Sequence, residues 1–158
     1  MRTINELRGK YKMLIKTKDF DFVNINEEDI ITFSQGIYAY ESTTKFIILN
    51  NPDNQWMKHL QSVEDEEPRF ILLDPHMFIE GYSPIIPDGT LGLLKTNDIK
   101  DLSFFAIAVI PKSVKDITIN LKSPVIINFK ERIGAQVILE NRDYFVRTRL
   151  FASEGTAQ

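Results

Sequence analysis

The residue types that perform metal chemistry are few and widely separated in this sequence. Its two histidines, His59 and His76, have no second histidine at ligand spacing, and the chain of 158 residues contains no cysteine. Structural zinc sites are built mainly from cysteine and histidine, so a site here would need both histidines and a carboxylate. We therefore predict no metal site and expect ordinary polar or surface roles for both histidines.

The sequence also lacks the motifs of nucleophilic catalysis and phosphate binding. It contains no G-x-S-x-G turn, no Walker A loop and no G-x-G-x-x-G fingerprint. The neighbouring carboxylates Glu64 and Asp65 would point to opposite faces of a strand, which is unsuitable for a general acid and base. We predict that the protein is not an enzyme and needs no cofactor. A hydrolase with buried carboxylates stays an open alternative, because such a cleft is not visible in a sequence.

One charge cluster is different in kind. Glu64, Asp65, Glu66 and Glu67 follow one another directly and are followed by Pro68. Four adjacent carboxylates repel one another and the proline fixes a turn, so a loop with a concentrated negative charge is expected between two strands. This loop is either an exposed connector or part of a surface that attracts a basic partner.

The acidic residues are unevenly distributed along the chain. The net charge is only −3, yet residues 19–101 contain 16 acidic and 5 basic side chains. An acidic surface disfavours a phosphate backbone and favours a basic partner, so we predict no direct binding of nucleic acid. Trp56 and the phenylalanines lack interleaved basic residues and are interpreted as core packing, not as platforms for stacked bases.

Most of the apolar residues stand in short runs rich in Ile, Val and Phe, bounded by Asn, Asp, Pro and Gly, which is typical of strands. Ile117, Ile119 and Leu121 alternate with polar residues, which predicts a half-buried strand. The remaining candidate strands are 12–16, 20–25, 45–49, 57–63, 70–73, 103–110, 125–129 and 135–139.

Helical signals are weak. Only the segment 97–102, with Asn97 as a candidate cap, and the first dozen residues are expected to form helical turns. Segments 125–129 and 135–139 predict a hairpin, in which Gly134 would supply the positive φ that a short loop often needs. We therefore predict an all-β, mainly antiparallel fold: a small, single-domain β-barrel with a few short helical turns.

Four blocks of the sequence, in order and register, resemble the family of flagellar assembly factors named FliW. The first block is residues 26–37, in which an acidic turn leads into an apolar strand and a Gln-Gly-Ile loop. The others are residues 60–65 with Phe70 and Asp74-Pro75, residues 120–128, and residues 136–139 with Tyr144 and Arg147. The resemblance spans residues 13–150, with Ser34 and Tyr38 standing where the family usually has prolines.

The resemblance implies a bacterial protein that binds flagellin in the cytoplasm and antagonises CsrA, an RNA-binding translational repressor, so that secretion of flagellin controls its synthesis. No catalytic, cofactor or metal residues are implied. The candidate partner-binding residues are the acidic loop and the loop of the first block: Glu64, Asp65, Glu66, Glu67, Phe33, Gln35, Gly36, Ile37, Tyr38 and Tyr40.

The predicted organisation is an N-terminal extension over residues 1–12, a barrel domain over 13–150 and a flexible tail over 151–158. No segment reaches the ~20 consecutive apolar residues of a membrane span, and no signal peptide is recognisable, so a cytoplasmic location is expected. A barrel that binds a small ligand is the alternative function, because the sequence predicts an aromatic-rich interior.

Overall fold

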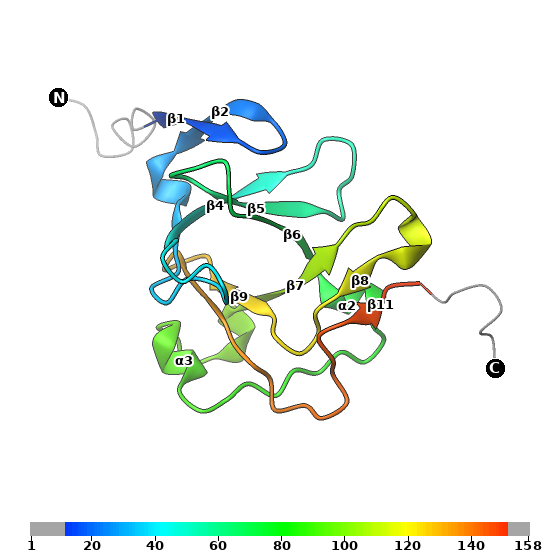
Figure 1. The fold of residues 1–158 in the computed structure, drawn as a ribbon. Coiled ribbons are helices and arrows are strands. Elements are labelled where there is room, and N and C mark those ends of the chain that lie inside the picture. Colours follow the sequence, from blue (N-terminus) through cyan, green and yellow to red (C-terminus); the bar gives the residue numbers. More distant parts are fainter. Residues whose placement is uncertain (1–11, 152–158) are drawn as a thin grey trace.

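The computed structural model describes residues 12–151, and the predicted extension and tail lie almost entirely outside this range. Its first element is a hairpin of β1 (Lys12–Thr17) and β2 (Asp21–Asn26), paired antiparallel with Lys12 opposite Asn26. Lys12, the last residue of the predicted extension, therefore lies in β1. Asp21 turns the chain with a φ of 52°. Figure 1 shows this hairpin lying across the outside of β4 and β5.

The second sheet closes into a barrel. Its strands are β3 (Ile31–Thr32), β4 (Lys45–Asn50), β5 (Lys58–Ser62), β6 (Arg69–Leu73), β7 (Ser103–Val109), β9 (Val125–Asn128) and β10 (Ile133–Gln136), with β8 (Thr118–Ile119) and β11 (Thr148–Arg149) continuing outward from β7. Neighbours pair antiparallel from β3 to β7, and β7 also pairs with β9. The parallel pairing of β10 with β3 completes the ring. The predicted fold class is therefore confirmed, with one parallel contact added.

Alternation along the strands separates the interior of the barrel from its outer layers, since successive side chains point to opposite faces. Phe46, Leu60 and Leu72 are fully buried inside the barrel together with Phe33, whose ring meets Phe46 edge to face at 5.3 Å. On the outer face, Ile47 packs against the hairpin in a small cluster of its own. A larger outer cluster forms where the segments after β6 and β10 cover β6, β7 and β9.

Most predicted strands agree with the structure to within one or two residues, and two predictions near the end of the chain are wrong. The strand expected at 135–139 is β10, which begins at Ile133. Arg132, with φ 53°, and not Gly134, takes the positive φ of the hairpin. Gly134 lies inside β10 against the ring of Phe33, where an added Cβ would lie 2.4 Å from Cζ. It is needed for close packing, which the sequence pattern does not reveal.

The helical segments were incompletely predicted. The turn expected at 97–102 exists as the 3₁₀ helix η2 (Ile99–Asp101), capped by Asp98 and not by Asn97. The missed segments are α2 (Pro75–Phe78), α3 (Thr90–Leu93), η1 (Glu27–Asp29) and η3 (Val114–Asp116). Each is too short to show a helical period. The strand predicted around Ile119 forms a ladder only over Thr118–Ile119, although Ile117, Ile119 and Leu121 are buried as the alternation predicts.

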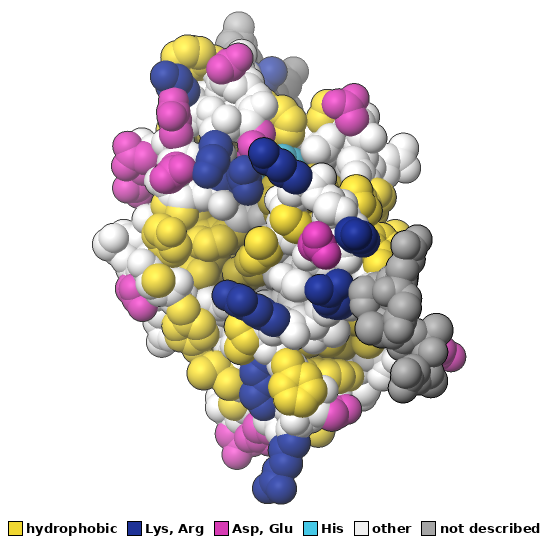
Figure 2. Space-filling model, turned by 45° about the vertical axis from the view of Figure 1, so that its right-hand side comes forward, with side chains coloured by type: hydrophobic (Ala, Val, Ile, Leu, Met, Phe, Trp, Pro, Cys, Tyr) yellow, Lys and Arg dark blue, Asp and Glu magenta, His cyan; other side chains and the backbone are white. Residues whose placement is uncertain are grey.

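None of the helices in residues 12–151 is long and apolar enough to cross a bilayer. The surface of one face combines hydrophobic side chains across its centre with separate Lys and Arg side chains between them (Figure 2).

Candidate partner-binding surface

The acidic loop connects β5 to β6 and is held by side chains at the end of β5. The Nε2 of Gln61 donates to the carbonyl oxygens of Asp65, at 3.1 Å, and Glu66, at 2.8 Å. Ser62 Oγ accepts from the amides of Glu64 and Asp65. Gln61 and Ser62 are themselves buried, so these bonds fix the loop backbone on the barrel while its four carboxylates are exposed. The predicted exposure of this loop is confirmed.

The four carboxylates are not equivalent. Glu66 pairs with Lys16 at 2.8 Å and Glu67 with Lys18 at 2.9 Å, both across to the β1–β2 hairpin. Within residues 12–151, no ion pair is recorded for Glu64 or Asp65. The loop therefore has one pair of carboxylates engaged with the hairpin and one pair with its charge available to a partner.

The second predicted segment, residues 33–40, is partly structural. Phe33 and Ile37 are buried in the barrel interior. Gly36 has a φ of 66°, and a Cβ there would lie 2.5 Å from the Cα of Glu41, so glycine is required. Because the side chains of Phe33 and Ile37 face the core and Gly36 is buried, we do not expect these residues to contact a partner directly. They position the loop.

Among the predicted partner-binding residues of this segment, Gln35, Tyr38 and Tyr40 are exposed. The amide of Tyr38 donates to Oε1 of Gln136 at 3.1 Å, and the Tyr40 ring packs edge to face on Phe70 at 5.5 Å. Both tyrosines still expose about half of their surface, 50% and 46%. Large, amphipathic side chains with few torsions are common contacts in protein interfaces.

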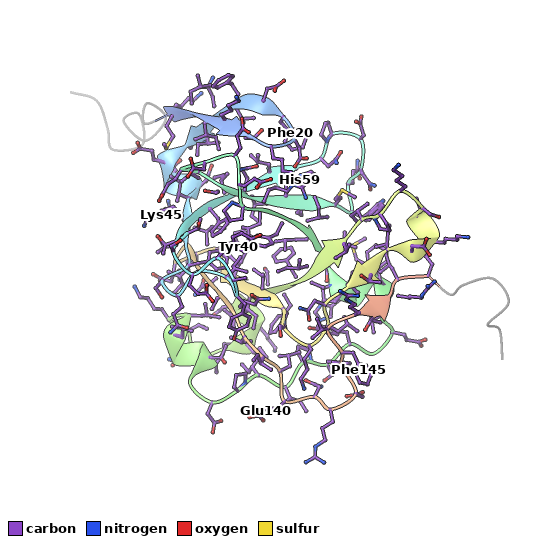
Figure 3. The ribbon with its side chains drawn as sticks, in the orientation of Figure 1. Phe20, Tyr40, Lys45, His59, Glu140 and Phe145 are labelled. Atoms are coloured by element: carbon purple, nitrogen blue, oxygen red, sulfur yellow. The ribbon has the colours of Figure 1, made fainter. Side chains whose placement is uncertain are left out.

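The two loops lie at the same end of the barrel strands. Residues 33–44 lead into Lys45, and the main-chain oxygen of Lys45 accepts from the amide of Val63, which immediately precedes the acidic loop. On the other side of that loop, Phe70 carries the ring of Tyr40. Figure 3 shows Tyr40 and Lys45 on this side of the ribbon, away from Glu140. We call Tyr38, Tyr40 and residues 64–67 the acidic–aromatic surface.

A polar cluster that sequence reasoning missed fastens the hairpin beside this surface. Asp19, in the turn of the hairpin, lies 2.9 Å from Nδ1 of buried His59 and 2.7 Å from Nε of Arg69. Asn51 Nδ2 is 3.2 Å from the other ring nitrogen of His59, and Phe20 packs on the ring (Figure 3). Burial acts to raise the pKa of Asp19, but the hydrogen bonds of His59 and Arg69 and the charge of Arg69 outweigh it and lower that pKa. These contacts join distant parts of the sequence, which no local motif signals.

The geometry also bears on the alternatives. A general acid needs a raised carboxyl pKa, whereas the pKa of Asp19 is lowered by its partners. Among residues 12–151, no group of three or more His, Cys, Asp or Glu is placed to hold a metal ion. The barrel interior is filled by side chains such as Phe46, Leu60 and Leu72, each with 0% exposure, so its aromatic residues are core packing and do not line a ligand cavity.

The comparisons with known proteins agree with one another. The family model described as FliW protein matches residues 13–150. A flagellar assembly factor FliW of Ruminiclostridium cellulolyticum is 39% identical over 136 residues, covering 85% of this chain and 92% of the relative. That of Bacillus velezensis is 36% identical over 132 residues, covering 84% and 92%. A crystal structure of the flagellar assembly factor FliW superposes with a TM-score of 0.84 at 31% identity, covering 90% of this chain and 99% of that one. The chain belongs to the FliW family.

Proposed function

We propose that this protein is a cytoplasmic flagellar assembly factor that binds flagellin and antagonises the RNA-binding repressor CsrA. Membership of the FliW family carries this proposal, since its relatives are named as flagellar assembly factors. In this role the protein senses unsecreted flagellin: while flagellin occupies it, the repressor is free to act, and secretion of flagellin returns the protein to the repressor. The role needs two binding events and no catalysis.

We assign capture of the repressor to the acidic–aromatic surface. A repressor that binds RNA carries a basic surface, because neutralising phosphates requires Lys and Arg. Glu64 and Asp65 offer two carboxylates without ion pairs within the described residues, and Tyr38 and Tyr40 offer apolar contact next to them. Exposed charges of this kind steer encounter, whereas aromatic residues contribute more to the lifetime of a complex.

Mutual exclusion of the two partners is a separate requirement. A standard interface buries roughly 800 Å² on each partner, and the protein has 10201 Å² of accessible surface. Two partners therefore have room to bind side by side. Exclusion requires that their footprints overlap or that the first partner changes the surface used by the second.

The proposal is tested by capture with the purified protein from a lysate of its flagellated host, with flagellin and the repressor probed in the same eluate. We expect both to be captured, and added flagellin to reduce the captured repressor. Capture of neither protein, against a matched unrelated β-barrel as control, would overturn the proposal.

A further inference from the structure

A second exposed surface lies on the other edge of β4, where the barrel wall is incomplete. In the β3–β4 pairing, Ile31 stands opposite Phe46, and continuing this register would place Asp29 opposite Ile48. Residues Glu27–Asp29 form the 3₁₀ helix η1 at this point, so the ladder ends. Within residues 12–151, the part of β4 beyond Phe46 therefore pairs only with β5.

The main chain of β4 shows which groups this leaves unpaired. The main-chain oxygen of Lys45 accepts from the amide of Val63, so Lys45, and by alternation Ile47 and Leu49, direct their backbone groups at β5. Ile48 and Asn50 then direct theirs at the opposite, open edge. Within residues 12–151, no backbone hydrogen bond is recorded for these two residues on that side. Such an edge is a template for a further strand.

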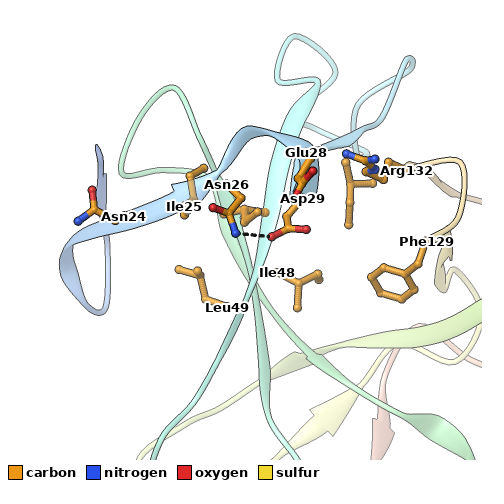
Figure 4. A pocket seen from close by; sticks show the side chains of 11 residues that line it. Asn24, Ile25, Asn26, Glu28, Asp29, Ile48, Leu49, Phe129 and Arg132 are labelled. Atoms are coloured by element: carbon orange, nitrogen blue, oxygen red, sulfur yellow. Dashed lines mark hydrogen bonds between the residues drawn. The ribbon is translucent and has the colours of Figure 1, made fainter. Parts of the chain in front are cut away.

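The open edge forms the floor of a surface cavity of about 500 Å³ (Figure 4), within the range of roughly 300–1,000 Å³ that is usual for ligand clefts. Figure 4 draws Ile48, Phe129, Glu28 and Asp29 on the same side of the β4 ribbon, and Ile25, Asn26 and Leu49 on the other. Phe129 is 45% exposed although it packs against the ring of Phe105. Apolar and acidic side chains therefore lie together beside the open edge.

The charged side chains that line the cavity next to β4 are acidic. Glu28 and Asp29 project from η1 over the cavity, and no ion pair is recorded for either within the described residues. Arg132 stands at the far end and has none in that range either. An added strand would therefore place side chains beside both groups, an apolar one beside Ile48 and a basic one beside the two carboxylates.

We infer that this edge is a docking site for an extended segment of a partner protein that carries apolar and basic residues. The segment adds a strand to β4, pairing with the backbone of Ile48 and Asn50, inserts an apolar side chain beside Phe129 and places Lys or Arg beside Glu28 and Asp29. Backbone pairing supplies affinity and the side chains supply specificity. This inference does not rest on the proposed function, and the edge is distinct from the acidic–aromatic surface.

The probe for a direct test is a fluorescein-labelled peptide, Thr-Ile-Lys-Ile-Lys-Thr, titrated onto the full chain and followed by fluorescence anisotropy. We expect saturable binding, and at least about tenfold weaker binding when glutamate replaces both lysines. Replacing Glu28→Gln and Asp29→Asn together should weaken binding about fivefold, since two exposed charge contacts are lost. The matched control, Glu140→Gln with Asp143→Asn, removes the same charge at two other exposed carboxylates and should leave the affinity within about twofold.

Hydrogen exchange with the saturating peptide locates the complex. We expect slower exchange of the amides of Ile48 and Asn50, because strand addition gives them acceptors. Equal weakening by both double variants would show non-specific charge attraction, and unchanged exchange at these amides would place the peptide elsewhere; either result overturns the inference. Binding only after removal of residues 1–11 would assign the edge to the chain's own N-terminus in place of a partner. None of these readouts involves flagellin or the repressor, so the proposed function stands or falls separately.

Discussion

In the acidic loop, Glu64 and Asp65 have no ion pair within the described residues. Neutralising both should slow capture of the repressor without unfolding the protein. Glu64 and Asp65 are exposed and lack ion pairs within residues 12–151, whereas Glu66 and Glu67 are engaged by lysines of the hairpin. The variant Glu64→Gln with Asp65→Asn therefore removes the charge available for steering. It retains the contacts that join the loop to the hairpin.

The size of the effect follows from Coulomb's law. At an encounter distance of about 10 Å in water, one carboxylate attracts a unit positive charge by about 0.4 kcal/mol, so two change the association rate about fourfold at low salt. At physiological ionic strength, where the Debye length is about 8 Å, screening reduces the change to about 1.5-fold. Loss of exposed charges leaves the melting temperature within about 3 °C.

The assay is stopped-flow association with the repressor at low and high salt. The matched control is Glu140→Gln with Asp143→Asn, which removes two exposed carboxylates; Figure 3 shows Glu140 away from Tyr40 and Lys45. We expect the control to keep the rate and its salt dependence. Equal rates for the loop variant and the wild type at every ionic strength would refute the reasoning and leave the loop as a connector. Equal slowing by both variants would show that only net charge matters.

Three further predictions concern the framework of this surface. Gly36→Ala should lower the unfolding free energy, measured with urea, by about 3 kcal/mol or more, because the added Cβ would clash with the backbone and φ is positive. Gly81→Ala is the control: its φ is 68° but nothing lies near the added Cβ, so it should cost only about 1–2 kcal/mol. Equal costs would contradict the clash at Gly36. Because the folded-state pKa of Asp19 is lowered, its contribution to stability is present above about pH 4 and is lost as pH falls through that pKa. Asp19→Asn should therefore lower the unfolding free energy at pH 7 and much less at pH 2. A difference in unfolding free energy that does not depend on pH would contradict this. Deleting residues 1–11, which precede β1, should leave the melting temperature and repressor binding nearly unchanged, and a large loss of either would show that the segment is part of the folded unit.

The sequence predicted the barrel better than it predicted the surface. Strands β4, β6 and β7 are rich in β-branched or aromatic residues, so their positions follow from local composition. The role of Gly134 depends on the ring of Phe33, a neighbour from the other end of the chain, and no local pattern contains that contact. For the same reason, the acidic loop was predicted as an exposed negative patch, but its division into engaged and available carboxylates was not.

The candidate loop at residues 33–40 shows a related limit. Its family-like pattern drew attention to all of its residues, yet Phe33 and Ile37 face the core while Tyr38 and Tyr40 face solvent. A motif marks both the residues that hold a loop and those that the loop presents. Only burial in the folded structure separates the two groups.

The proposed function requires that flagellin and the repressor compete for this protein. The most direct measurement uses fluorescently labelled repressor, saturated with the protein, into which purified flagellin from the same host is titrated while anisotropy is recorded. If the two proteins compete, anisotropy falls to the value of the free repressor, at flagellin concentrations that rise with the amount of repressor present. Anisotropy that rises to a new plateau, from a complex containing all three proteins, would contradict it.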